Sequence, residues 1–199
     1  MEVEIMKRSI IALILVSVFM LCLPACQIEN TDNLIYTSLN VLAQAKTENY
    51  SICICVTAAD GSSVKETYDV TTVEGVRSVA YAIETRNTFV IENGVITAPE
   101  ESVTITTGIY DETESAKADY DLPSLTFSDA SVRNLVNREG LPPFGFSAEV
   151  VSTEKLIGKL INGTDIRIEG TYGLNTLETV TLSYKSLSGN SVTVTYTYR

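Results

Sequence analysis

Residues 177–199 read "LETVTLSYKSLSGNSVTVTYTYR", and their pattern is the clearest indication of the type of fold. On both sides of the Leu187–Asn190 turn, apolar residues alternate with hydroxyl-bearing or charged ones, which is the period of a strand with one buried face. A connection this short joins antiparallel neighbours. The preceding run, 164–172 ("TDIRIEGTY"), has the same alternation. The sequence therefore predicts an antiparallel meander at its C-terminal end.

The same period of two recurs toward the N-terminus. Turn signals separate the runs, namely Asp60-Gly61-Ser62, Gly75 and Asn93-Gly94, of which the last is a strong hairpin signal. Short connections again favour antiparallel neighbours. Further strands are predicted at 49–60, 64–73, 76–85, 88–98, 102–110 and 144–151.

Helical spacing appears in three places. The apolar residues of 33–46 predict an amphipathic helix, and Ser128 is expected to cap a second helix over 130–139. Residues 152–163 fit either a helix or a strand, because Gly158 interrupts a helical pattern. The fold class expected is α+β, with an antiparallel sheet, an N-terminal helix and one or two short helices packed on one face.

Composition excludes several functions. The chain has 14 Lys+Arg against 25 Asp+Glu, a net charge of −11, and no histidine. An acidic surface repels phosphate backbones, so nucleic acid is not an expected partner. Without histidine there is no Ser-His-Asp or Cys-His catalysis and no His-bearing zinc site. The sequence also contains no phosphate-binding loop and no nucleophile elbow. We expect neither an enzyme nor a cofactor.

Acidic residues cluster at Glu100-Glu101 and within 110–121 ("YDETESAKADYD"). The second cluster does not match a calcium-binding loop, since its spacing is wrong and no glycine stands at its turning point. It is predicted to be a solvated loop without a metal. The chain has no Trp, which argues against a sugar-stacking cleft between paired carboxylates.

A targeting signal precedes the predicted domain. Lys7-Arg8 is followed by Ile10–Leu23, which is apolar apart from Ser17. This is the pattern of a secretory signal, and it is shorter than the about 20 apolar residues of a membrane-spanning helix. Met6 directly precedes the basic pair and is an alternative initiator.

The residues Leu23-Pro24-Ala25-Cys26 that end this signal resemble the lipobox of bacterial lipoproteins. The resemblance implies that Cys26 receives diacylglycerol and, after cleavage, becomes an acylated N-terminus carrying chains such as palmitate. Two or more chains anchor a protein stably to a bilayer. The expected organisation is a signal peptide (1–25), a lipidated tether (26–32) and one domain (33–199), held outside the cytoplasm on the cell surface or the periplasmic face.

A lipidated chain with this order of elements resembles the half-barrel carriers of the LolA, LolB and LppX type. Residues 33–57, "NLIYTSLNVLAQAKTENYSICICVT", are similar to the opening helix and strand of that group. The resemblance implies a curved antiparallel half-barrel with a cavity for a lipid or other hydrophobic ligand, in a non-catalytic protein. The alternative is a protein-interaction or envelope-structural module with a filled core. In both cases the membrane is a partner through the lipid anchor.

Two groups of strand residues are candidates for a special role. Cys53 and Cys55 share one strand face, too far apart for a mutual disulfide, and are predicted to be small buried hydrophobes. Tyr184, Tyr196 and Tyr198 lie in the last two strands. They either line a ligand cavity or a partner surface, or cover the sheet as ordinary half-buried strand residues.

Overall fold

The computed structural model describes residues 31–45, 47–87, 90–92, 95–97, 102–117, 120–138, 140 and 142–199. The chain divides into two units, residues 1–35 and Tyr36–Arg199. The predicted signal, Met6 and Cys26 lie outside the described residues. None of the helices in the described ranges combines the length and the apolarity needed to cross a bilayer.

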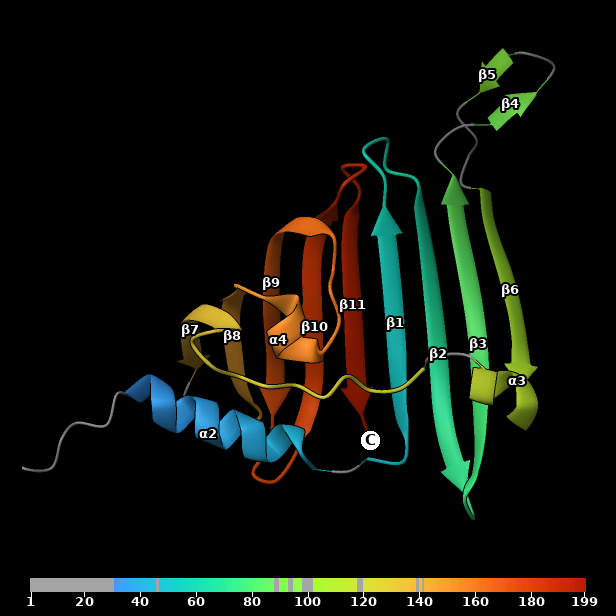
Figure 1. Cartoon of the computed structure of the whole chain (residues 1–199). Helices are drawn as coiled ribbons and strands as arrows, with labels where there is room; N and C mark the ends of the chain where they lie inside the picture. The colour runs from blue at the N-terminus through green and yellow to red at the C-terminus, as the bar shows by residue number, and fades with distance from the viewer. Residues whose placement is uncertain are drawn as a thin grey trace, which may run out of the picture. The chain divides into compact units, whose positions relative to one another are not determined.

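Nine strands of the second unit form one open, curved antiparallel sheet (Figure 1). They are β1 (Tyr50–Thr57), β2 (Ser63–Val73), β3 (Val76–Asn87), β6 (Ser102–Tyr110), β7 (Val132–Arg138), β8 (Phe144–Val150), β9 (Gly163–Tyr172), β10 (Leu177–Ser186) and β11 (Ser191–Tyr198). Their order is β6-β3-β2-β1-β11-β10-β9-β8-β7. Two meanders therefore meet where β1 pairs with β11. These two strands are the first and the last of the sheet in sequence order, and they lie side by side in its middle.

The predicted strands are confirmed, including the C-terminal meander of β9, β10 and β11. The turn between β2 and β3 has Glu74 and Gly75 at φ 52° and 82°, the left-handed pair that closes a tight hairpin. The predicted run 88–98 contains a separate hairpin, β4 (Val90–Glu92) paired with β5 (Val95–Thr97). Its central pair Asn93-Gly94 lies outside the described residues.

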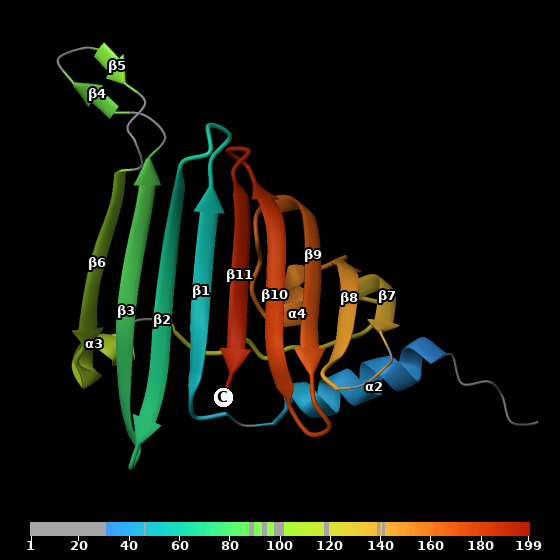
Figure 2. The ribbon, with the colours of Figure 1, turned by 180° about the vertical axis from the view of Figure 1, so that it is seen from behind.

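The antiparallel register sorts side chains onto two faces of the sheet. On the inner face, one row runs across Tyr196, Ile52, Tyr68 and Tyr81 on four neighbouring strands. The inner face holds the buried core, which includes Tyr50, Ile52, Tyr68, Val70, Val79, Phe146, Ile168, Val180 and Leu182. The outer face, toward the viewer in Figure 2, carries mainly hydroxyl-bearing and charged residues.

The described residues form three short helices besides the strands, so this part of the chain is mostly β. Helix α2 (Thr31–Ala43) confirms the helix expected over 33–46. Helix α4 (Thr153–Ile157) settles the ambiguous segment 152–163: Ser152 caps its N-terminus by accepting from the Lys155 N–H, and Gly158, at φ 70°, ends it.

Helix α3 (Glu112–Lys117) lies inside the segment predicted to be a loop, and that prediction is wrong for these residues. The Asp111 carboxylate accepts a hydrogen bond from the Glu114 N–H at 2.7 Å. Glu112 and Glu114 occupy the first turn, where negative charge is favourable to a helix.

The helix predicted over 130–139 is also wrong, because this segment is the edge strand β7. Val132 is fully buried, whereas Val136 is 53% exposed, so the presumed helical stripe does not share one face. The strand pairs with β8, and its register shifts between Arg133 and Val136, where Asn134 has φ 53°. Pairing with β8 satisfies the backbone hydrogen bonds of this segment and buries Val132. The spacing of its apolar residues does not reveal that pairing, because it depends on a strand outside the segment.

Candidate functional site

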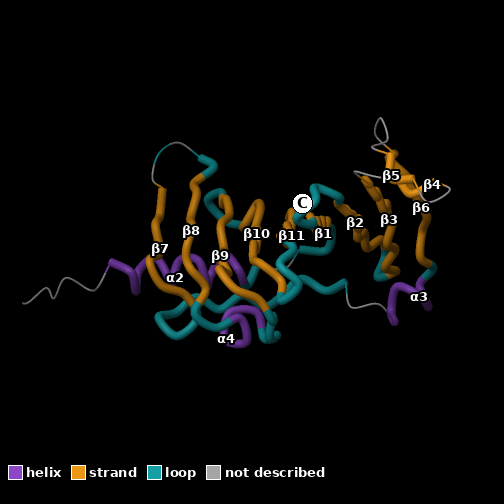
Figure 3. Tube along the Cα trace, turned by 90° about the horizontal axis from the view of Figure 1, so that it is seen from above, coloured by secondary structure: helices purple, strands orange, loops and turns teal. Residues whose placement is uncertain are grey.

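The segment Tyr120–Ser131, here called the strap, passes over the inner face of the sheet between α3 and β7 (Figure 1). Seen from above, the strap, α3 and α4 lie on the same side of the sheet (Figure 3). The strap buries Leu125 and Phe127, and the Phe127 ring meets Phe146 edge-on with centroids 5.5 Å apart. It therefore covers part of the core that the sheet alone would leave exposed.

Hydrogen bonds hold the strap at both ends. Near its start, Tyr50 Oη donates to the Tyr120 carbonyl at 2.6 Å, and Arg77 pairs with Asp121 at 2.9 Å. Farther along, the Thr126 N–H donates to the Leu156 carbonyl of α4 at 2.8 Å. The stretch between these attachments spans the inner face without filling the space beneath it.

That space is a cavity of about 700 Å³. Its volume falls in the range of about 300–1,000 Å³ that is usual for small-molecule sites. Four strands, the strap and the end of α4 build it, so residues distant in sequence share one wall. Its lining is Ile52, Ile54, Tyr68, Tyr120, Asp121, Leu122, Pro123, Ser124, Ile157, Gly158, Lys159, Ile161, Leu182, Tyr184, Val194 and Tyr196.

Tyrosines form one side of this cavity. The ring centroids of Tyr68 and Tyr120 are 4.7 Å apart. Behind them, the Tyr110 ring lies 5.7 Å from that of Tyr120 and 4.7 Å from that of Tyr81. Burial and the hydrogen bond with Tyr110 raise the pKa of Tyr120 to about 12. Burial, and then the hydrogen bond that Tyr68 donates to Glu66, raise the pKa of Tyr68 as well. Both phenols stay neutral at physiological pH.

The candidate tyrosines of the last strands divide between two places. Tyr184 and Tyr196 line the cavity, which supports the first of the two roles predicted for them. Tyr198 lies opposite Tyr50 in the register of β1 and β11. Burial raises the pKa of Tyr198 to about 12.

The prediction that Cys53 and Cys55 fill the core is wrong. Both are free, half-buried thiols on the outer face. Cys53 lies opposite Thr67 and Thr195 in the register, and the Thr67 hydroxyl approaches its sulfur at 4.0 Å. The alternate residues of β1 take the inner face, since Ile52 is only 6% exposed.

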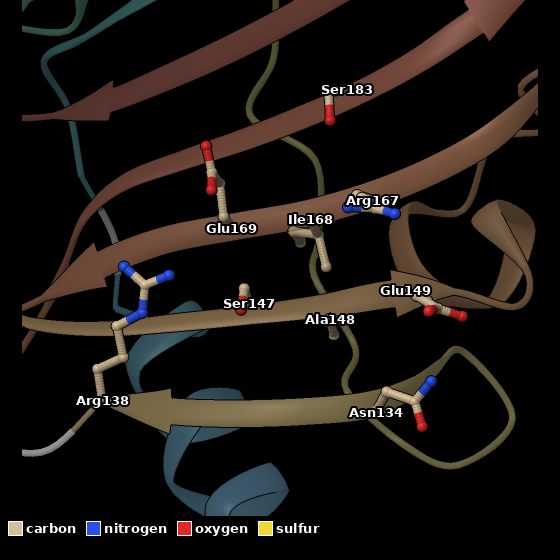
Figure 4. Close-up of a pocket in the computed structure, with 9 residues that line it drawn as sticks. All are labelled: Asn134, Arg138, Ser147, Ala148, Glu149, Arg167, Ile168, Glu169 and Ser183. Atoms are coloured by element: carbon tan, nitrogen blue, oxygen red, sulfur yellow. The ribbon is translucent and has the colours of Figure 1, made fainter.

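A second hollow lies on the outer face and is polar. It has a volume of about 410 Å³ and is lined from β7 to β10 by residues that include Ser147 and Ser183. Figure 4 shows Arg138 and Glu169 toward one end and Arg167 and Glu149 toward the other. Hydrogen bonds, first from Arg133, lower the pKa of Glu149. Since the charged residues at both ends are largely solvated, this hollow is a weaker site than the larger cavity beneath the strap.

No group of three or more potential metal ligands occurs among the described residues. Asp111 and Asp121 of the acidic segment are engaged elsewhere, in capping α3 and in the pair with Arg77. Glu100 and Glu101 lie outside the described residues. No sequence pattern indicates the cavity residues contributed by the strap, such as Leu122, because their role depends on long-range contacts.

Comparison with known proteins gives no assignment. No protein-family model matches the sequence, and no curated protein matches it. Among solved structures, a de novo designed fluorescence-activating β-barrel matches 80% of this chain and 98% of its own length. The two are 9% identical, with a TM-score of 0.20. A score this low supports no conclusion about fold or function.

Proposed function

We propose that this protein is a non-catalytic, lipid-anchored carrier that binds a lipid or another hydrophobic ligand outside the cytoplasm. In this proposal the curved sheet acts as a half-barrel, the strap and the short helices cover its inner face, and the acyl chains on Cys26 hold it to the membrane. The lipobox-like residues before Cys26 support the anchoring.

The observation that carries the proposal is the cavity of about 700 Å³ beneath the strap. The cavity combines a buried apolar floor, which includes Ile52 and Leu182, with polar side chains at its open edge, and this is the usual form of a small-molecule site. The apolar residues of the lining, such as Ile52 from the sheet and Leu122 from the strap, favour a ligand with an apolar part.

Native mass spectrometry tests the proposal on residues 27–199. This chain contains the whole unit Tyr36–Arg199, with the sheet, the strap and the core, so it retains every contact of the cavity. After incubation with bacterial membrane extract, we expect an adduct of lipid mass that is lost on denaturation.

The same experiment can reject the carrier. A clean unliganded mass after incubation with extract, together with an intact fold by circular dichroism, would favour the interaction module. The matched control is heat-denatured protein treated with the same extract, since it retains any lipid that adheres without a folded cavity.

A further inference from the structure

The two borders of the sheet, β7 and β6, differ in how they are protected from further strands (Figure 2). At the first border, the register of β7 shifts between Arg133 and Val136, and Asn134 has φ 53°. Arg133 and Arg138 add charge to the same strand. Bulges and charged side chains of this kind hinder an edge strand from pairing with another chain. The border at β7 is therefore unsuited to a further strand.

The border at β6 lacks this protection. The nine residues of the strand read "SVTITTGIY", with no charged residue and no proline. They pair with β3 in an unbroken register, from Val79 opposite Tyr110 to Asn87 opposite Ser102. Among the described residues, no strand pairs with the other side of β6. The backbone polar groups on that side can therefore pair with one more strand.

β6 also presents a row of apolar side chains on the outer face. Gly108 lies opposite an inner-face residue of β3, so the residues on either side of it face outward. Of this outer row, Val103, Ile105 and Ile109 are 38%, 64% and 72% exposed. Thr107 completes the row. A strand at this border would cover apolar side chains as well as satisfy backbone groups.

We propose that a second copy of this protein pairs with this border, β6 to β6, in an antiparallel two-fold dimer in which the two sheets join. Directly opposite residues of joined sheets share a face, and pairing of all nine residues places Thr106 opposite its own copy. Val103 then lies opposite Ile109 of the second copy, and Ile105 opposite Thr107, each pair occurring twice. The strand is thus complementary to itself.

The net charge of −11 opposes this association only weakly. The charged residues of β3 within the register, Glu84 and Arg86, pair with each other at 3.8 Å. The acidic residues Glu112 and Glu114 of α3 follow Tyr110, the last residue of β6. In an antiparallel pair the two Tyr110 residues lie eight positions apart, about 27 Å at about 3.4 Å per residue. That separation exceeds the screening length of about 8 Å at physiological ionic strength.

The same observations disfavour other arrangements of two copies. Pairing of β6 with β7 of another copy would need a regular β7 and would leave free borders that extend into a filament, whereas β6 with β6 closes. One strand pair is smaller than the standard interface of about 1,600 Å², so we expect a dissociation constant in the micromolar range. The residues of β6 are not among those that line the cavity, so the dimer does not depend on the carrier function.

Sedimentation velocity of residues 27–199, from about 1 µM to about 500 µM, tests the proposal. We expect a monomer at the low end and a dimer at the high end. Ile105→Lys places a charge on each side of the junction and should raise the dissociation constant at least about tenfold. Val136→Lys, at a 53% exposed position of β7, is the matched control and should leave it unchanged. Circular dichroism verifies that both variants are folded.

Disulfide crosslinking tests the register independently, in a background of Cys53→Ser and Cys55→Ser. Thr106→Cys places each thiol opposite its own copy, with Cα atoms about 4.5–5.5 Å apart, a distance that a disulfide spans. Thr104→Cys lies four positions from its copy, about 14 Å, and should not crosslink. A monomer at every concentration would overturn the proposal and leave the border to a strand of another protein. An unchanged dimer in Ile105→Lys, or equal crosslinking of the two cysteine variants, would also overturn it.

Discussion

The side-chain amide of Asn40 hydrogen-bonds both backbone polar groups of Phe127. Asn40 Nδ2 donates to the Phe127 carbonyl at 2.9 Å, and Asn40 Oδ1 accepts from the Phe127 N–H at 2.7 Å. The pairing mimics one rung of a sheet and joins α2 to the strap across 87 positions of sequence. It satisfies backbone groups next to a buried ring, where an unpaired donor or acceptor is costly.

Asn40→Asp should therefore destabilise the domain. Aspartate keeps the acceptor for the Phe127 N–H but places an oxygen against the Phe127 carbonyl, so that carbonyl loses its donor. We expect the free energy of unfolding in urea to fall by about 1–3 kcal/mol at pH 7. Val41→Ala, at a 64% exposed position of the same helix, should change it by less than about 0.5 kcal/mol. Equal effects in the two variants would show that the pairing contributes little.

Serine substitutions on the two faces of β1 should differ in their effect on stability. Cys53→Ser places a hydroxyl among the outer-face residues Thr67 and Thr195 and should change the free energy of unfolding by less than about 1 kcal/mol. Ile52→Ser puts a hydroxyl on the buried inner face, and we expect a loss of more than about 2 kcal/mol. Urea denaturation of both variants provides the measurement. A large loss for Cys53→Ser would place that thiol in the core after all.

Tyr198 predicts a dependence of stability on alkaline pH. Its pKa is about 12 in the folded protein against 10.0 for an exposed tyrosine, because burial disfavours the phenolate. Unfolding therefore makes deprotonation easier, and stability that is fully present below pH 10 is lost as the pH rises toward 12. Tyr198→Phe removes this contribution.

The measurement compares the free energy of unfolding of the wild-type protein and Tyr198→Phe from pH 8 to 12. The two curves should run parallel up to about pH 10 and then separate, with the wild-type protein declining more steeply. The difference between the curves cancels the titration of lysines common to both proteins. If the curves stay parallel to pH 12, Tyr198 does not titrate with a raised pKa.

The sequence predicts those parts of the fold that depend on local pattern. Strands of period two and the turn at Gly75 follow from side-chain alternation and left-handed backbone preference, and both are confirmed. The segment containing Val132 and Val136 is different, because its apolar spacing predicts a helix, whereas the segment forms an edge strand. Pairing with β8, a contact outside the segment, decides between them.

The cavity is less predictable than the sheet for the same reason. Tyr184 and Tyr196 are recognisable as candidates because they lie in strongly alternating strands. Leu122 and Ser124 come from an irregular segment with no periodicity to place it, and they line the cavity because Asn40 and Leu156 hold the strap. In the case of Cys53, alternation identifies a shared face but does not say which face meets the core.

Filling the cavity should separate ligand binding from folding. Val194 lines the cavity from β11, and Val194→Trp would direct an indole ring into a space of about 700 Å³. Because the space exists already, we expect the free energy of unfolding to change by less than about 1 kcal/mol, below the cost of overpacking a filled core. Retention of lipid from membrane extract should be lost, because the ring occupies the volume that the apolar chain needs.

Thr193→Trp is the matched control, since the neighbouring residue of the same strand faces outward beside Cys55 and Ser183. The natural chain contains no Trp, so each variant has a single tryptophan, whose emission can be excited selectively. Addition of oleate should leave the emission of the Thr193→Trp protein unchanged while native mass spectrometry still detects bound ligand. If both variants retain lipid, the ligand binds elsewhere, because an indole ring in the cavity does not then prevent binding.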